Sequence, residues 1–170
     1  MLQLKCTKKL LEFIGEKPVP FPEKANETIL GGWHANVVDF MRPRLVVFLN
    51  DATLFCLVDV VDPEYERINL ALIFRKNLLR VLQENQATEA LINRISKDYS
   101  ESVITKTDSR KTLGNMNDIM NQIYFHIERA DEENSPVILR NLGHDLNSIP
   151  QRNINWGLSK DVFKQLLDAS

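Results

Sequence analysis

The chain has 170 residues, of which 44% are hydrophobic and 26% charged, and its formal net charge at pH 7 is −2. This balance is typical of one soluble globular domain that buries a core of its own, and it excludes a disordered chain. The charge gives no overall attraction to nucleic acid, so we do not expect a nucleic-acid partner. No apolar run approaches the roughly 18 residues of a membrane helix, and lysines interrupt the N-terminal segment, which excludes a signal peptide. We therefore expect a cytoplasmic protein with no membrane partner.

The first part of the chain predicts a strand, a short helix and a long loop. Apolar and polar residues alternate over residues 2–6, which is the pattern of a strand with one buried face. Thr7 is a suitable N-cap for a helix over 8–14, and Gly15 follows as its stop. Three prolines and a closing Gly-Gly pair predict a loop over 16–32.

The middle of the chain predicts an antiparallel meander. The runs WHANVVDF, RLVVFLN and ATLFCLVDVV are rich in Val, Leu and Phe, and only MRP and ND separate them. Connections this short allow only hairpins. The second and third runs are apolar on both faces, so we expect both to be central in the sheet and covered on both sides.

Helices and one more strand follow. Apolar residues recur at helical spacing over about 66–84, 89–99 and 115–129, and residues 101–107 resemble a strand. The order of elements predicts an α+β fold. In this fold the three helices pack on a largely antiparallel sheet, with a central three-stranded meander over about 33–60.

The sequence after these elements has a weaker pattern. Pro, Gly and Asn are scattered through a polar stretch, in which residues 137–139 are the candidate for a short strand. Ser159 is then expected to cap a last amphipathic helix over 160–168. We therefore divide the chain into a core domain over 1–130 and a C-terminal extension over 131–170. The terminal helix is expected to pack on the core or beside it.

Three motifs resemble those of an uncharacterised bacterial family. The chain contains Cys-Thr-Lys-Lys-Leu at 6–10, Trp-His-Ala-Asn at 33–36 and Gly-x-Met-Asn-Asp at 114–118. In this order they are similar to a domain of unknown function in small bacterial proteins, over about residues 1–129. The resemblance implies a bacterial or phage origin and places the later residues outside the shared part. It implies no particular reaction.

His34 and Asn36 form the first candidate site. Side chains alternate along a strand, so His34 and Asn36 share one face while Trp33 lies on the other. In one interpretation His34 is a general base and Asn36 orients it at the mouth of a pocket, with Trp33 as a binding residue. In the other, both form a polar bracket, in which buried polar groups bond loop backbone. We favour the polar bracket.

The segment KTDSRKTLGNMND contains the second candidate site. Gly114 and Asn115 are expected to begin a helix, and its free N–H groups would hold an anion together with Arg110. Asn115 and Asp118 can instead cap that helix, and we favour this simpler interpretation. The binding candidates in this segment are Arg110, Lys111, Asn115 and Asn117.

Asp118 is also a candidate catalytic residue. Asp118, Gln122 and His126 are spaced by four and form one polar row on the expected helix. A His/Asp/Asn site would form only if His34 came close to this row. A solvated helix face is the preferred interpretation.

The chain lacks the common catalytic and cofactor motifs. It contains no P-loop, dinucleotide-binding, serine-hydrolase, zinc-protease or EF-hand signature. Cys6 and Cys56 lie in apolar stretches without zinc-site spacing, so we expect buried reduced thiols, no metal and no cofactor.

These observations favour a binding protein over an enzyme. We expect a small non-enzymatic regulatory protein that acts through a protein partner, encoded by a bacterium, a phage or another mobile element. Phe163 and Leu166 of the last helix are the candidate partner contacts. The alternative is a metal-independent enzyme acting on a phosphate-bearing substrate such as RNA. It would use His34 as base, and Arg110 plus the Gly114–Asn115 helix start as the anion clamp.

Overall fold

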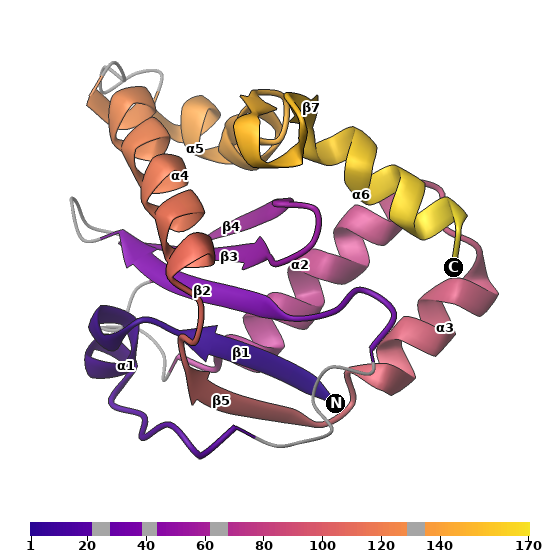
Figure 1. Ribbon diagram of the computed structural model, residues 1–170, viewed down its shortest axis with the longest axis horizontal. Coiled ribbons are helices and arrows are strands. Elements are labelled where there is room, and N and C mark those ends of the chain that lie inside the picture. Colours follow the sequence, from indigo (N-terminus) through magenta and orange to yellow (C-terminus); the bar gives the residue numbers. More distant parts are fainter. Residues whose placement is uncertain (22–27, 39–43, 62–67, 129–134) are drawn as a thin grey trace.

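A five-stranded mixed sheet lies at the centre of the protein and carries helices on both faces (Figure 1). The structure is a computed structural model that describes residues 1–21, 28–38, 44–61, 68–128 and 135–170, with backbone alone over 135–140. The strand order is β4-β3-β2-β1-β5. The strands are β1 (Leu2–Cys6), β2 (Trp33–Val38), β3 (Arg44–Asn50), β4 (Cys56–Val61) and β5 (Ser102–Lys106). The predicted α+β class is confirmed.

The predicted meander is present but occupies one side of the sheet. β2 pairs with β3, and β3 with β4, both antiparallel, and Trp33 stands opposite Asn50 at the start of β2. β3 is buried almost throughout, as expected for a strand covered on both faces. The expectation of a central position is wrong for β4, which is an edge strand of this sheet and exposes Val60.

β1 is more deeply buried than the sequence indicated. It lies between β2 and β5 and is parallel to both, so only the meander half of the sheet is antiparallel. Alternation predicts that the apolar residues of β1 are buried and that Gln3 and Lys5 face solvent, yet Gln3 and Lys5 are buried as well. The prediction of one buried face is therefore wrong, because an inner strand of a covered sheet has no solvent face.

Six α-helices are described. They are α1 (Lys8–Ile14), α2 (Leu70–Glu84), α3 (Glu89–Asp98), α4 (Arg110–Glu128), α5 (Ser135–Leu146) and α6 (Ser159–Asp168). Thr7 caps α1 and Gly15 ends it in the left-handed conformation, as predicted. Among the described helices, none is long and apolar enough to cross a membrane.

Two predicted helix starts and one predicted strand differ from the structure. α2 begins at Leu70 because Asn69 caps it, while residues 62–67 lie outside the described part. α4 begins at Arg110, five residues before the expected start, because the Ser109 hydroxyl accepts a hydrogen bond from the N–H of Thr112. The expected strand over 137–139 is wrong, since this stretch belongs to α5.

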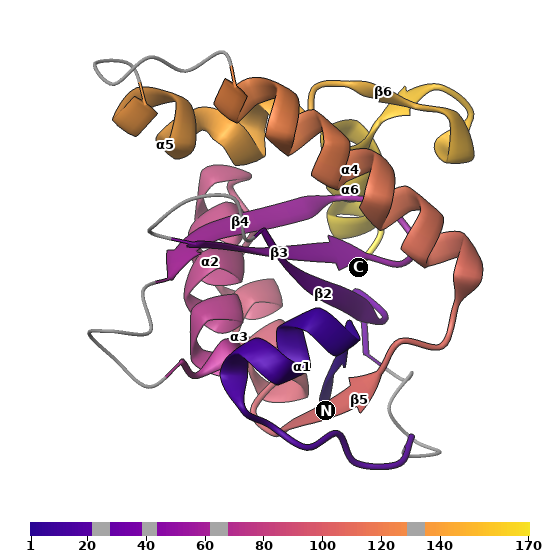
Figure 2. The same cartoon turned by 90° about the vertical axis from the view of Figure 1, so that its left-hand side faces the viewer.

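Two hydrophobic cores cover the two faces of the sheet. On one face, Trp33, Phe48 and side chains of α2, α3 and α6 form an aromatic core in which Phe74 contacts both rings edge to face. On the other, β2 and β3 pack on α4 and α5. Figure 2 shows α4 crossing this second face. A small hairpin of β6 (Pro150–Gln151) and β7 (Gly157–Leu158), with the 3-10 turn Arg152–Ile154 between them, joins α5 to α6.

Candidate functional site

Four charged or titratable side chains form a closed ring on the α4 side of the sheet. Lys5 of β1 stands beside His34 of β2, Asp51 follows β3, and Asp108 lies between β5 and α4. Each carboxylate contacts both Lys5 and His34. The Lys5 ammonium lies 3.0 Å from Oδ2 of Asp51 and 3.0 Å from Oδ2 of Asp108. His34 places Nδ1 2.5 Å from Oδ1 of Asp51 and Nε2 3.4 Å from Oδ1 of Asp108. We call these four residues the charge ring.

The charge ring shifts the ionisation of two of its members. Burial alone raises the pKa of Asp51, but hydrogen bonds and charge attraction from His34 and Lys5 outweigh it and lower that pKa overall. Burial lowers the pKa of Lys5, and the two facing carboxylates outweigh this and raise it overall. Both groups are therefore held in their charged forms, so the ring contains an ammonium between two carboxylates.

Two buried polar atoms near the ring have no hydrogen-bond partner among the described residues. Nε2 of His34 is one, because its approach to Asp108 lacks hydrogen-bond geometry, although the His34 side chain is only 1% exposed. Oε1 of Gln3 is the other, while Nε2 of Gln3 donates to the hydroxyl of Thr105 at 3.3 Å. A partnerless buried polar atom is rare and costs free energy. The ring is therefore incomplete at His34.

The turn after β3 explains how Asp51 reaches the ring. Oδ1 of Asn50 accepts hydrogen bonds from the backbone N–H groups of Ala52 and Thr53, which closes the turn locally. The N–H of Asp51 donates to the carbonyl of Gly32 at 3.0 Å. A Cβ atom on Gly32 would lie 2.7 Å from Oδ2 of Asp51, so only glycine leaves room for the carboxylate.

His34 and Asn36 are both on the predicted face but have different partners. Asn36 accepts a hydrogen bond from the Thr7 hydroxyl at 2.7 Å and so attaches the start of α1 to β2. The charge ring, not Asn36, orients His34. Trp33 is buried, and its Nε1 donates to the Tyr99 hydroxyl at 3.2 Å, so it is a core residue and not a surface for a ligand.

The second predicted site does not form in the expected way. Gly114 and Asn115 lie in the second turn of α4, so the expected anion clamp at a helix start over these residues is wrong. Asn115 is buried and accepts a hydrogen bond from Asn153. Four of the remaining candidates on α4 are exposed: Arg110, Lys111, Asn117 and Asp118.

Sequence reasoning missed three members of the charge ring, namely Lys5, Asp51 and Asp108. The alternation of residues 2–6 predicts a solvent-facing Lys5 on a half-buried strand. The segment KTDSRK indicates a site through its cations, and its pattern does not single out Asp108. The available signal was the Asn-Asp pair that ends β3 directly opposite Trp33, because such a hairpin register brings Asp51 near His34.

The next question is whether the charge ring or the two cysteines could hold a metal ion. Within the described ranges, no group of three or more His, Cys, Asp or Glu side chains is placed to hold a metal ion. In the ring, the Lys5 ammonium occupies the position between the carboxylates. Cys6 and Cys56 are buried free thiols, and burial raises the pKa of each to about 12.

A groove runs along the outer edge of β4. It has a volume of about 960 Å³, with residues 55–60 as its floor, Arg80 and Glu84 of α2 on one wall, and His144 of α5 on the other. Asn147, which follows α5, bonds both backbone groups of Cys56 at 2.8 Å: Oδ1 accepts from the N–H and Nδ2 donates to the carbonyl.

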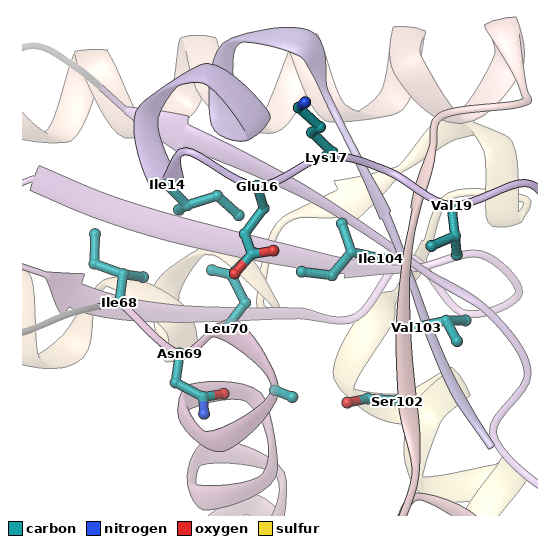
Figure 3. Close-up of a pocket in the computed structure, with 11 residues that line it drawn as sticks. Ile14, Glu16, Lys17, Val19, Ile68, Asn69, Leu70, Ser102, Val103 and Ile104 are labelled. Atoms are coloured by element: carbon teal, nitrogen blue, oxygen red, sulfur yellow. The ribbon is translucent and has the colours of Figure 1, made fainter.

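A second cavity of about 490 Å³ lies at the opposite edge of the sheet, beside β5 (Figure 3). In Figure 3 the carboxylate of Glu16 reaches in among Ile14, Leu70 and Ile104. The N–H of Val19 donates to the carbonyl of Ile104 at 2.9 Å, so the chain itself already occupies part of this edge. None of the candidates from the sequence lines the cavity.

The expected partner contacts on α6 are directed into the protein. Phe163 is fully buried and stacks on Phe55 with ring centroids 4.3 Å apart. Leu166 is partly buried and packs against the same core. Phe163 is therefore not available to a partner, because the terminal helix packs on the core.

Comparison with known proteins identifies a family but no relative of known function. A family model described as a domain of unknown function, DUF6933, matches residues 3–162. This confirms the resemblance to an uncharacterised domain. It also extends past residue 129, where the shared motifs were expected to end. No curated protein and no solved structure matches the chain.

Proposed function

The chain belongs to the DUF6933 family, and on that premise we propose that it is a non-enzymatic binding protein that takes up an extended segment of a partner protein. The segment adds as a strand to the outer edge of β4. Strand addition of this kind obtains affinity from main-chain hydrogen bonds and specificity from alternate side chains.

The observation that carries the proposal is the open hydrogen-bonding edge at Val58. The N–H and carbonyl of Cys56 point away from β3, because Asn147 bonds both of them. Backbone groups alternate in direction along an edge strand, so the N–H and carbonyl of Val58 point outward as well. Within the described part of the chain, no group bonds the outward backbone of Val58. The N–H of Val60 donates a hydrogen bond to the carboxylate of the neighbouring Asp59.

The surroundings of this edge fit a peptide chain. The groove is open along β4, and its walls present one cation and one anion of α2, Arg80 and Glu84, opposite His144. An added strand would direct alternate side chains to these two walls. Native proteins usually cover or charge an open edge, and none of the residues that the structure describes covers this one between α2 and α5.

The regulatory role, the cytoplasmic location and the bacterial or phage origin belong to the same proposal. Two buried free thiols support a reducing compartment. The similarity of the three sequence motifs to small bacterial proteins supports the origin. The net charge of −2 supports a protein partner over nucleic acid.

Peptide-library selection followed by hydrogen exchange tests the proposal. Selected peptides are expected to slow exchange of the Val58 amide. Val58→Pro removes the outward donor without removing a bond to β3, so it should fold and lose binding. Val58→Thr keeps the donor and the shape and should bind. Peptides that protect other amides, or that bind Val58→Pro equally well, would rule out strand addition.

One observation supports the alternative hypothesis that the protein is an enzyme acting on a phosphate-bearing substrate. Asp51 holds Nδ1 of His34, which is the arrangement that orients a histidine base. Of the residues expected to bind an anion for this enzyme, only Arg110 lies at the start of α4, where it is exposed in the first turn. A phosphodiesterase assay on short RNA, with His34→Gln as the comparison, tests this candidate. Equal rates for both proteins would eliminate it.

A further inference from the structure

The contact between His34 and Asp108 depends on a single proton. Nδ1 of His34 lies 2.5 Å from Asp51, so a neutral imidazole carries its hydrogen there and donates it to the carboxylate. Nε2 is then an acceptor, and it faces Oδ1 of Asp108, another acceptor, at 3.4 Å. Two acceptors at this distance repel each other. A proton on Nε2 replaces the repulsion with attraction between a positively charged imidazolium and the Asp108 carboxylate.

Asp108 is the more exposed carboxylate of the charge ring. Its side chain is 39% exposed, compared with 24% for Asp51, and its remaining contact in the ring is the Lys5 ammonium. Asp51, in contrast, is fixed by the turn that Asn50 closes and by its bond to Gly32. A change in the charge of His34 therefore acts on Asp108.

The position of Asp108 is linked to the start of α4. Ser109 follows it directly, and the Ser109 hydroxyl and carbonyl accept hydrogen bonds from the N–H groups of Thr112 and Leu113. Arg110 and Lys111 then form the exposed first turn. Asp108 is thus the residue through which the charge ring holds the N-terminal end of this helix to the sheet.

We propose that His34 and Asp108 form a proton-operated latch. With a proton on Nε2, Asp108 is bound to the sheet and the first turn of α4 is fixed. Without it, Asp108 turns to solvent and the first turn loosens. Among the described residues, the charged groups facing His34 are Lys5 of β1, Asp51 of the β3–β4 turn and Asp108 itself. The latch is separate from strand addition, because it lies at β1 and β2 whereas the added strand would pair with the edge strand β4.

Nitrogen NMR of the imidazoles across roughly pH 5–8, where histidines titrate, tests the latch directly. As the pH falls, the Nε2 resonance of His34 should move from the pyridine-type to the pyrrole-type frequency. The amide resonances of Ser109, Arg110 and Lys111 should shift with the same midpoint. His144 and His126 provide internal references for a solvent-exposed and a partly exposed ring, respectively.

Asp108→Asn and Asp118→Asn complete the test. Asp108→Asn removes the carboxylate that faces Nε2 of His34, so the pH-dependent shifts at Ser109–Lys111 should vanish. Asp118→Asn changes an exposed carboxylate elsewhere on α4 and should leave those shifts unchanged. The latch is rejected if Nε2 stays unprotonated, if the amides ignore its protonation, or if they still shift with pH in Asp108→Asn.

Discussion

Asn147 forms two hydrogen bonds of 2.8 Å with the backbone of Cys56, a residue 91 positions earlier in the chain. The side-chain amide takes the place that a neighbouring strand would have at this point of the edge. The hydroxyl of Ser159 also donates to Oδ1 of Asn147 at 2.9 Å, so the starts of β4 and α6 meet at one amide group. The chain after α5 is thereby attached to the sheet.

Asn147→Ala should destabilise the protein by about 1–3 kcal/mol. The substitution leaves the N–H and carbonyl of Cys56 buried without partners, which is the costly way to lose hydrogen bonds. Chemical denaturation measures the free energy of unfolding. Asn121→Ala, on the exposed side of α4, should change it by less than about 0.5 kcal/mol. Equal effects for the two substitutions would show that the amide of Asn147 contributes nothing.

Gly32→Ala and Gly114→Ala should have opposite effects. A Cβ on Gly32 would lie 2.7 Å from Oδ2 of Asp51 and 3.4 Å from the Lys5 ammonium, so the charge ring must distort. A Cβ on Gly114 meets nothing within 4 Å, and in a helix alanine is favoured by about 0.5–1 kcal/mol. Thermal denaturation should place the first variant below the wild type and the second above it. A Gly32→Ala variant as stable as the wild type would show that Asp51 can leave the ring at no cost.

Acid should remove the stability contributed by Asp51. Its pKa is lowered in the folded state, so the unfolded chain binds more protons as the pH falls below about 4. The contribution is complete above the pKa of the unfolded chain and is lost as the pH falls through that of the folded state. Asp51→Asn should therefore show a shallower loss of stability below about pH 4 than the wild type. Asp118→Asn should follow the wild type, and parallel curves for all three proteins would contradict the assignment.

Both cysteines should resist alkylation while the protein is folded. Burial raises the pKa of Cys6 and of Cys56 to about 12, so almost no thiolate exists at pH 8. Iodoacetamide followed by mass spectrometry should find two unmodified thiols in native protein and two modified thiols in urea. Rapid labelling of Cys56 alone would indicate that the β4 edge opens locally.

Phe163→Ala should destabilise the whole protein by about 3–5 kcal/mol, because a fully buried aromatic ring is replaced by a cavity. Phe163 stacks on Phe55 and meets Trp33 edge to face at 6.4 Å. Denaturation followed by Trp fluorescence measures the change. The half-buried Leu166→Ala is the matched control and should cost less. A small effect at Phe163 would show that α6 contributes little to the core.

The local features of the fold were predictable and the charge ring was not. The hairpins followed from the two short connections between apolar runs, and alternation placed His34 and Trp33 on opposite faces. The neighbour of His34 in the ring is Lys5, on a parallel strand, and no local pattern specifies the register of such a pair. Asp108 comes from still further along the chain, after β5.

The predicted boundaries of α4 and α5 were wrong for identifiable reasons. The first turn of α4 is polar, so the apolar periodicity that marked the helix began only at Met116, and Gly114 resembled a boundary. α5 was missed because Pro136 and Gly143 indicated a loop. Proline is nonetheless acceptable in the first turn of a helix, where its missing N–H has no partner to lose.

The parallel pairing of β1 with β5 sets a limit on the order of folding. β1 is the first strand in the chain, yet its partner on one side begins at Ser102, opposite Leu2. During synthesis the ribosome must release about a hundred residues before this pair can form, and pairings of such long sequence separation form slowly. Until then the apolar residues of β1 lack one of their neighbours. The meander, whose contacts are local, has no such delay.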